Sequence, residues 1–548
     1  MKLKSGRIEK TLDSLSSKSI LRNLTYSAAV IFFFVIILIP PILGIFVKWN
    51  VIGQIWENPP LMSRALSAIY ASFAIAIFVS MIDIVFGLPF AWFIARGRSK
   101  WLNVLDTFAD IPFIVPTVTL GYSLLLFWSG PGGISSLFGE SLVSPGWLLI
   151  ILLHFTFSYP VVVRVMVGEI LDYEQRYEEA ARTLGAAPYI VARTVTLPIL
   201  KTGIITSFIL AFARSISETG ATMMVAGTFE NGPIFIKNAM TLASESPLVF
   251  VSFVLIAVSC VIFTAIRLLG QRLRIPIKKV WPVVERRLST RGIVASRDAI
   301  SILIFLLIVL APSLFVVLPA TRALFSGTFT QALTGSGVWQ GYWQALILSY
   351  AVGAIVTLSN IVAGLPMAVL IARKKVGTLP LTILDVLVNI PLIVPSIALG
   401  ISLSFFWKSL TFIPEIWLLI FAHLSITYPY FVRAMSAAIE GVNVDFEDSA
   451  RVLGARSFTV FRTIILPLTK YSLFSGAIMM FTRSVDETGA TLAVVTKLKT
   501  APVLLVDWVK GGVPVGPLEI GLGCGFLVIL SFIVLLILRI LIRGGQHT

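Results

Sequence analysis

The chain carries the same short acidic segment twice. The first copy reads EEAARTLG, residues 178–185, and the second reads EDSARVLG, residues 447–454. In each copy acidic and small residues precede a glycine, a pattern that predicts a short polar helix ending at the glycine. Small side chains let another backbone approach closely, so the segment is expected to bind a partner protein. One copy alone fits an ordinary amphipathic loop helix, whereas two copies in register favour a shared partner.

A second repeated pattern places charges inside long apolar stretches. RSISETGAT begins at residue 214 and RSVDETGAT at residue 483. An ionised side chain at the centre of a membrane helix costs ~2.5–3.5 kcal/mol on insertion scales and normally faces protein or water. We therefore expect these charges either to line a translocation pathway or to form structural ion pairs near the cytoplasmic end of the fifth span. They are Arg214, Glu218, Arg483, Asp486 and Glu487.

Catalytic patterns are absent from the sequence. There is no G-x-x-x-x-G-K-[ST] loop, so ATP hydrolysis by P-loop chemistry requires another protein. The sequence also lacks H-E-x-x-H and C-x-x-C motifs. We expect a chain that is not an enzyme and that binds no metal or cofactor itself. The repeat-related His154 and His423 are expected to pack or to form hydrogen bonds rather than to bind a ligand, and Asp83 has no partner that the sequence suggests.

The composition requires a membrane protein. Hydrophobic residues make up 57% of the chain, charged residues 13%, and the mean hydropathy is +0.94, which a water-soluble surface cannot cover. The predicted fold class is therefore an all-α polytopic membrane protein. A spanning helix needs ~20 apolar residues. About twelve segments satisfy this length: 26–47, 66–95, 104–128, 145–166, 199–225, 246–268, 299–319, 344–372, 382–407, 414–435, 470–494 and 517–542.

The net charge of +16 does not indicate nucleic acid, because the basic residues cluster beside the spans. They concentrate in the N-terminal segment, after the second and eighth spans, around residues 267–297 and at the C-terminal end. An excess of Lys and Arg on short loops marks the cytoplasmic side of a membrane. Alternating spans then place both termini and both acidic segments in the cytoplasm, with membrane lipid around the spans.

The repeat extends over both halves of the chain. Residues 110–121 read DIPFIVPTVTLG and residues 389–400 read NIPLIVPSIALG. We predict two tandem permease repeats of six spans, residues 1–268 and 299–548, joined by a basic cytoplasmic linker at 269–298. Because six is even, the halves have the same orientation and are related by an axis along the membrane normal. A pathway is expected at their interface.

Prolines interrupt the third span of each half. Pro116 and Pro395 follow Pro112 and Pro391 at the same spacing. A proline in a span frees backbone carbonyls, which is tolerated where protein or a cavity satisfies them. Pro116 and Pro395 therefore mark either a moving gate or a packing kink.

The repeated acidic segment carries a family resemblance. The pattern is Glu-Ala-Ala, three residues, Gly, nine residues, and then an aliphatic residue, any residue and Leu-Pro. This chain has Glu179, Ala180, Ala181, Gly185, Val195, Leu197 and Pro198 at those positions. It resembles the cytoplasmic signature of permease subunits of binding-protein-dependent ABC importers, and the likeness covers nearly the whole chain. The second copy departs from the pattern, with Asp448 and Ser449 where the first has Glu179 and Ala180.

The resemblance implies partners and a mechanism. Each segment would form a coupling helix in a groove of a cytoplasmic ATPase, with two ATPase copies per chain and ATP and Mg²⁺ bound by the ATPase. One extracytoplasmic solute-binding protein would deliver the solute, and alternating access would carry it across the cell membrane of a prokaryote. The departure at the second copy suggests two ATPase contacts that are not equivalent. The implied coupling residues are Glu178, Glu179, Ala180, Ala181, Gly185, Glu447, Asp448, Ser449, Ala450 and Gly454.

The substrate is less constrained. Residues 114–128 and 213–222 are similar to stretches of molybdate and sulfate permeases, which favours a small oxyanion. Fusion of both halves in one chain resembles the ferric-iron and thiamine importers. An alternative class is an ion-gradient-driven secondary transporter with two six-helix halves. That class leaves the paired acidic segments unexplained, and a channel or scaffold leaves the buried charges unexplained as well.

Overall fold

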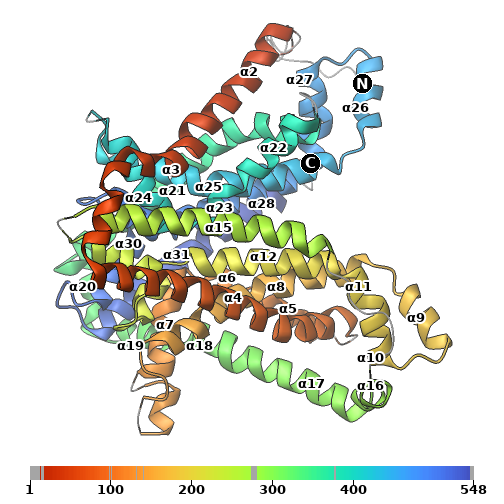
Figure 1. Ribbon diagram of the computed structural model, residues 1–548, viewed down its shortest axis with the longest axis horizontal. Coiled ribbons are helices and arrows are strands. Elements are labelled where there is room, and N and C mark those ends of the chain that lie inside the picture. Colours follow the sequence, from red (N-terminus) through yellow and green to blue (C-terminus); the bar gives the residue numbers. More distant parts are fainter. Residues whose placement is uncertain are drawn as a thin grey trace.

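The computed structural model describes residues 13, 18–97, 99, 101–130, 132–139, 141–242, 244–272, 281–374, 378–410 and 412–543. These residues form helices joined by turns, with no strand among them (Figure 1). The predicted all-α polytopic fold is confirmed. Residues 1–12, 14–17, 273–280 and 544–548 lie outside the description, so part of the predicted linker and the predicted cytoplasmic location of both termini stay predictions.

Within the described residues, nine helices are long and apolar enough to cross a membrane, and three bent pairs raise the number to twelve. The bent pairs are Val104–Ile114 with Thr117–Leu137, Pro188–Ile199 with Lys201–Ser217, and Ile383–Ile393 with Ser396–Lys408. They fall on the third, fifth and ninth predicted spans. The upper count agrees with the sequence prediction, but three of the twelve spans are reached only as bent pairs.

The first half contains α2 (Ser19–Phe32), η1 (Phe33–Leu38), α3 (Ile39–Leu43), η2 (Gly44–Glu57), α4 (Pro59–Arg96), α5 (Leu102–Phe108), α6 (Ile111–Ile114), α7 (Thr117–Ser129), η3 (Ile134–Leu137), α8 (Trp147–Asp172), α9 (Arg176–Thr183), α10 (Pro188–Val191), η4 (Ala192–Thr196), α11 (Leu197–Ile199), α12 (Lys201–Ser217), α13 (Gly220–Val225), α14 (Gly232–Ala239) and α15 (Ser246–Arg272).

The linker contributes α16 (Pro282–Leu288). The second half contains α17 (Arg291–Ile304), η5 (Phe305–Leu310), α18 (Ala311–Leu314), α19 (Val317–Leu324), α20 (Gly327–Thr334), α21 (Val338–Ala372), α22 (Thr378–Val388), α23 (Ile390–Ile393), α24 (Ser396–Lys408), α25 (Glu415–Glu440), α26 (Val444–Val452), α27 (Ser457–Val460), η6 (Phe461–Ile465), α28 (Leu466–Val485), α29 (Gly489–Val494), α30 (Ala501–Val509) and α31 (Pro517–Arg543).

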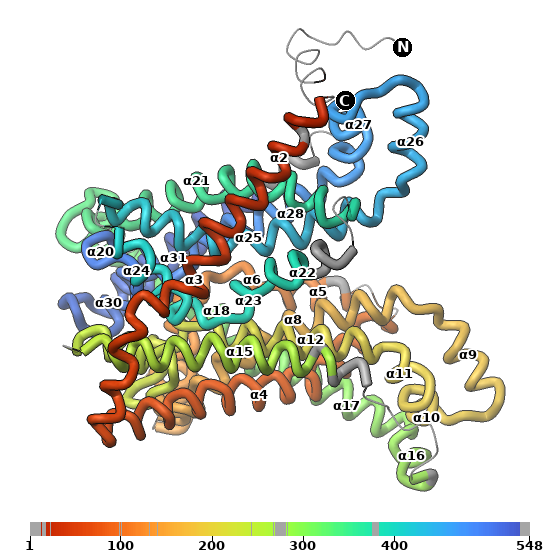
Figure 2. Tube along the Cα trace, turned by 45° about the horizontal axis from the view of Figure 1, so that its top comes forward, coloured from red at the N-terminus to blue at the C-terminus, as the bar shows by residue number. Residues whose placement is uncertain are grey.

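The two halves exchange their first spans. The first span of the first half, α2 with η1, packs against α21 and α25 of the second half (Figure 2). The first span of the second half, α17 with η5, packs against α4 and α8 of the first half. Each half therefore packs as five of its own spans plus the first span of the other, an arrangement that the sequence analysis did not predict.

Hydroxyl groups hold each exchanged span in place. Pro41 and Pro312 lack an N–H, which leaves the carbonyls four residues earlier, at Ile37 and Ile308, without their helical donors. In lipid such groups must find donors inside the protein. Ser425 donates to the Ile37 carbonyl at 2.6 Å, and Thr156 donates to the Ile308 carbonyl at 2.9 Å. Ser402 and Ser123 likewise donate to the Pro40 and Pro312 carbonyls, at 3.2 and 2.6 Å.

The portion of each broken third span that precedes the break is tied to the fourth span by an arginine. Arg164 on α8 donates to the carboxylates of Asp110 at 2.5 Å and Asp106 at 2.8 Å. In the second half Arg433 on α25 donates to Asp385 at 2.5 Å. These ion pairs orient the segments that lead into α7 and α24.

Candidate coupling and translocation sites

The two acidic segments form helices at the same end of the molecule. Both α9 and α26 project beyond the packed spans, at the right of Figure 1. Gly185 and Gly454 follow them with φ of +84° and +88°, a left-handed conformation that glycine adopts without steric cost. Ala186 donates to the Ala181 carbonyl at 3.2 Å, and Gly185 donates to the Arg182 carbonyl at 2.9 Å. This double closure is a Schellman motif.

Helix α26 of the second copy ends in the same motif. Ala455 donates to the Ala450 carbonyl at 2.9 Å, and Gly454 donates to the Arg451 carbonyl at 2.9 Å. The predicted polar helix that ends at a glycine is confirmed in both halves. The chain direction after each helix is thus set by a left-handed glycine.

The first acidic residue of each copy faces inward. Glu178 is 4% exposed and Glu447 is 3% exposed. Glu178 accepts from Thr196 at 3.1 Å and lies 3.5 Å from Arg96 at the end of α4. Glu447 pairs with Arg373 at 2.7 Å, at the end of α21. Buried charges of this kind need such partners, so these two glutamates brace α9 and α26 against the membrane spans and do not face a partner.

The outer surface of each copy combines acid with exposed apolar side chains. Glu179, Ala180, Asp448 and Ser449 are exposed, and Ala181 and Ala450 are half-buried. Large apolar residues beside them are exposed at matching positions of the two halves. They are Tyr177, Leu184, Phe446 and Leu453. Apolar side chains gathered at a protruding polar element mark a surface for protein contact.

The fifth span is not the continuous helix that we expected over 199–225. Glu218 adopts extended backbone (ψ 126°) between α12 and α13. Its carboxylate accepts from the Ala221 N–H at 3.0 Å, and Glu487 accepts from the Ala490 N–H at 2.9 Å before α29. A helix start presents unpaired N–H groups that attract an anion. Each glutamate is therefore the cap of a second, shorter helix inside the span.

The expected Arg-Glu pairs differ between the halves. Arg483 lies 2.6 Å from Glu487. Arg214, the corresponding residue of the first half, instead lies over the Phe157 ring, with its guanidinium carbon 5.5 Å from the ring centroid. Both glutamates follow helices that run from the coupling loops, and the 17 residues of α12 rise about 25 Å. The charges thus lie far from the end of the span that joins the acidic helices α9 and α26, the end near which the structural alternative had placed them.

Two buried histidines join the pieces of each broken fifth span. His154 on α8 hydrogen-bonds Ser215 at 2.8 Å and Thr222 at 2.9 Å, one residue on each side of the break. His423 on α25 bonds Ser484 at 2.8 Å and Thr491 at 2.9 Å. The expectation that these histidines form hydrogen bonds is confirmed.

We expect His154→Ala to destabilise the chain, because it leaves the hydroxyls of Ser215 and Thr222 buried without that partner. A buried polar group left unpaired costs ~1–3 kcal/mol. The midpoint of thermal unfolding in detergent should fall, and His423→Ala should lower it similarly. His154→Gln, which keeps polar atoms in place, is the control. An unchanged midpoint for both alanine variants would exclude the bridging role.

The sequence ETGAT brings the two halves into contact. A Cβ built on Gly220 would lie 2.5 Å from the Thr488 hydroxyl of the other half. A Cβ built on Gly489 would lie 2.7 Å from the Thr219 hydroxyl. Cβ atoms do not approach other atoms this closely, so both positions admit only glycine in this arrangement. The contact is reciprocal and lies where the repeats meet.

The helices after the prolines begin at the same junction. Pro116 and Pro395 immediately precede α7 and α24, and each broken span bends by 106° there. A packing kink does not describe a bend of this size. Asp486 accepts from the Thr117 N–H, the first of α7, at 2.7 Å across the halves. Ser396, the first residue of α24, donates to the Ser217 carbonyl at 3.3 Å.

The structure thus gathers the predicted pathway residues. Asp486 interacts electrostatically with Glu218, Arg214 and Arg483. Sequence reasoning missed the uncharged residues that make the contact, although the identical ETGAT in both halves was the signal for them. The missed residues are Thr117, Ser217, Thr219, Gly220, Ser396, Thr488 and Gly489.

Asp83 has a partner after all. Its carboxylate accepts a hydrogen bond from Ser158 on α8, and it is fully buried. The corresponding residue of the second half is Asn360, which donates to Thr427 at 2.9 Å. The same link between the second and fourth spans is made with an acid in one half and an amide in the other.

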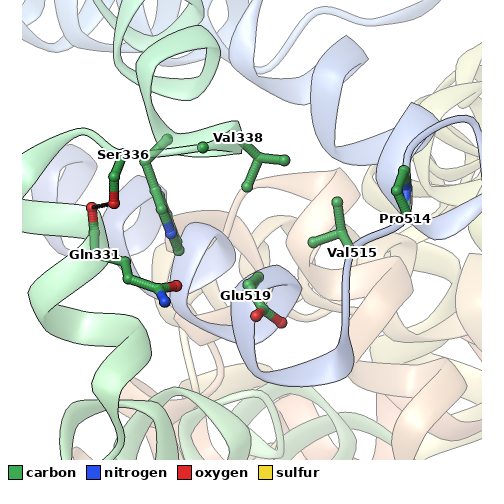
Figure 3. A pocket seen from close by; sticks show the side chains of 8 residues that line it. Gln331, Ser336, Val338, Pro514, Val515 and Glu519 are labelled. Atoms are coloured by element: carbon green, nitrogen blue, oxygen red, sulfur yellow. Dashed lines mark hydrogen bonds between the residues drawn. The ribbon is translucent and has the colours of Figure 1, made fainter.

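The end opposite the coupling helices carries a cavity of about 210 Å³ between the α20–α21 and α30–α31 connections (Figure 3). Its lining residues include Gln331, Ser336, Val338, Val515 and Glu519. Arg64, near the start of α4, and Asn238 hydrogen-bond Glu230, and the bond from Arg64 is the main cause of a lowered pKa of that carboxyl. Among the described residues, no group of three or more His, Cys, Asp or Glu side chains could hold a metal ion.

Comparison with known proteins identifies the family. Residues 87–275 and 360–544 both match the binding-protein-dependent transport system inner membrane component family. The sulfate transport system permease protein CysT of Salmonella typhimurium is 31% identical over 227 residues, 39% of this chain and 79% of that protein. The molybdenum transport system permease protein ModB of Escherichia coli is 31% identical over 184 residues, 33% of this chain and 80% of that protein. CysT of Synechococcus elongatus is 29% identical over 202 residues, 36% of this chain and 71% of that protein.

The helical membrane fold and the repeated acidic helices α9 and α26 are those of a membrane transport subunit. The chain belongs to the binding-protein-dependent transport system inner membrane components, the permeases of ABC importers. Because the family occurs twice, the chain is a fused and duplicated permease. Membership implies a separate ATPase and an external solute-binding protein as partners, and it places this multi-pass chain in the cell membrane.

Proposed function

We propose that the chain carries a small oxyanion, sulfate or molybdate, from an external binding protein into the cytoplasm in an ATP-driven importer. The observation that carries the proposal is the pair of coupling helices. α9 and α26 stand at one end of the molecule, and each ends at a left-handed glycine beside exposed acidic and apolar residues. The sulfate and molybdenum permeases among the relatives supply the substrate class.

In this proposal each coupling helix seats in one of two ATPase copies, which bind ATP and Mg²⁺. Glu179 and Asp448 would face the ATPase, and Gly185 and Gly454 would set the angle at which each helix is presented. Glu178 and Glu447 would transmit force inward, through Arg96 and Arg373. Both termini would lie on the same cytoplasmic side.

The translocation pathway would run between the halves, and the ETGAT contact would close it. Closure of the ATPases would rock the halves and separate Gly220 from Thr488 and Gly489 from Thr219. The N-termini of α7 and α24 reach this junction, and helix N-termini favour anions. Pro116 and Pro395 would hold these helix ends in position, together with the buried Glu218 and Glu487 and the half-buried Arg214, Arg483 and Asp486.

Transport tests the proposal directly. The tagged chain is purified in mild detergent with the ATPase and binding protein that accompany it, and the complex is placed in proteoliposomes. We expect saturable uptake of labelled sulfate or molybdate that requires ATP inside the vesicle. If the chain alone accumulated a solute driven by an ion gradient, the secondary-transporter class would replace this proposal.

Replacing Glu179 and Asp448 together by Lys should abolish co-purification of the ATPase. Both side chains are exposed on the coupling helices, and like charge across a contact costs several kcal/mol. The measured quantity is the amount of ATPase recovered per chain, expected to be about two copies for the unmodified chain. Glu57→Lys, an exposed site at the opposite end, is the matched control. Undiminished ATPase recovery from the double variant would remove these helices as the docking sites.

A further inference from the structure

The linker between the halves is docked on the first coupling loop. α16 packs against α10, the short helix that follows α9 and Gly185 (Figure 1). Arg193 of η4 lies 2.8 Å from Glu285 of α16, and the two side chains are only 12% and 4% exposed. A buried ion pair depends on both partners, because losing one leaves the other charge uncompensated.

A hydrogen bond extends this contact to the start of α10. Pro188 is the first residue of that helix and has no N–H, so Tyr189 carries the first N–H that needs a partner. Tyr189 donates to the Ser289 hydroxyl at 3.0 Å, and Ser289 donates to the Glu285 carbonyl at 2.8 Å. The linker thus caps α10 and neutralises Arg193 with two side chains four residues apart.

The second half has a corresponding contact. The N–H of Thr459, in α27 just after the second coupling helix, donates to Asp13 at 3.0 Å, and its hydroxyl donates to the same carboxylate. Asp13 precedes the first span of the first half, as α16 precedes the first span of the second half. Each coupling loop is therefore contacted by the segment that leads into the other half's first span.

Because the first spans are exchanged, the contact between α16 and the first coupling loop also connects that loop to a membrane span of the second half. α17 follows α16 directly and packs on α4 of the first half. The linker and the first coupling loop therefore belong to the same packed unit. A coupling loop held only by its own two chain ends could bend when pushed, whereas one braced by α16 passes the displacement to α17 as well.

We propose that Glu285 and Ser289 of the linker are positioning residues for the first coupling loop. They hold α10 and Arg193 so that the loop, α16 and α17 move as one unit when the ATPase closes. The proposal rests on the proposed function, because it presumes that an ATPase acts on this loop. Asp13 has the same role toward the second loop.

A charge exchange in the complete complex tests the ion pair. Arg193→Glu, Glu285→Arg and the double variant are compared for labelled sulfate and molybdate uptake per ATP hydrolysed in proteoliposomes. We expect each single variant to lose about tenfold in this ratio and the double variant to return to within about threefold of the unmodified chain. Arg286→Glu, exposed on the same helix, is the control and should match the unmodified chain.

The outcomes separate this inference from the proposed function. If the unmodified complex shows no ATP-driven uptake, the proposed function fails. If the unmodified complex transports and the single variants keep its uptake per ATP, the positioning role is wrong while the proposed function stands. A double variant no better than the worse single variant also overturns the role, because the pair then does not act through its mutual charge.

A disulfide between the linker and the first coupling loop tests whether the two stay together during transport. The 3.0 Å bond from Tyr189 to Ser289 places the two Cα atoms at most about 7 Å apart, which is within reach of a disulfide. Tyr189→Cys/Ser289→Cys is made in a chain whose native Cys260 and Cys524 are replaced by Ala, and oxidised and reduced forms of the same complex are compared. Equal uptake in the two forms, well above that of vesicles without ATP, supports motion as one unit. Uptake lost on oxidation and restored on reduction, or failure of the disulfide to form, overturns it.

Discussion

Gly220→Val should lower oxyanion uptake by about 10- to 100-fold while the ATPase stays bound. The new Cβ would lie 2.5 Å from the Thr488 hydroxyl and 2.8 Å from the Thr488 Cβ. Overpacking of this kind costs ~1–3 kcal/mol, and each 1.4 kcal/mol is about a tenfold change in population. The arrangement in which the halves touch would be depopulated, so the pathway would no longer close. The measurement is uptake by proteoliposomes beside ATPase recovery from the same preparation.

Two comparisons make this result specific. Gly489→Val should act in the same way, because its Cβ would meet the Thr219 hydroxyl at 2.7 Å. Gly168→Val is the control, since Gly168 lies exposed on α8 with no atom within 4 Å of its Cβ position. If Gly220→Val transported like the control, the ETGAT contact would not be the closure of the pathway.

Gly185→Val should uncouple ATP hydrolysis from transport. No atom lies within 4 Å of the Gly185 Cβ position, and its φ is +84°, so the effect comes from backbone strain and not from a clash. A left-handed conformation costs an L-residue ~1–2 kcal/mol, and a β-branched residue is disfavoured further. The exit from α9 would change direction while the spans stay folded. Uptake per ATP hydrolysed should fall by about tenfold or more.

Asparagine supplies the matched substitution. Asn adopts the left-handed conformation more readily than Val, so Gly185→Asn should retain most of the uptake. Gly454→Val in the second loop, where φ is +88°, asks whether the two coupling contacts are equivalent. Full transport by Gly185→Val would count against a coupling role for this turn.

Much of the molecule followed from local pattern. Hydropathy over windows of span length found a segment for each of the twelve spans, because a helix that crosses lipid must be long and apolar with its backbone groups satisfied internally. The fifth and eleventh spans nevertheless begin earlier than predicted, at Pro188 and Ser457. The glycine ends of α9 and α26 were also predictable, since a glycine after a short polar helix indicates a left-handed cap. The duplication and its parallel orientation needed only the repeat and an even number of spans.

The interior of the spans was less predictable. An apolar window does not reveal a break, so the division of the fifth span at Glu218 was missed. The interpretation of Glu218 as one member of an ion pair was wrong for the first half, where it caps α13 and Arg214 lies over Phe157. A carboxylate at helical spacing from an arginine satisfies either arrangement, and packing against α8 decides between them.

The sequence by itself indicated a duplicated membrane protein that carries the acidic signature of ABC importer permeases in both halves, because hydrophobic length and repeated motifs are local properties. Only the tertiary structure decided that the first spans are exchanged, that Gly220 meets Thr488, and that the linker braces the first coupling loop through Glu285. These contacts join residues far apart in the chain. Their formation depends on which surfaces fit and which buried polar groups find partners, and no local pattern encodes that.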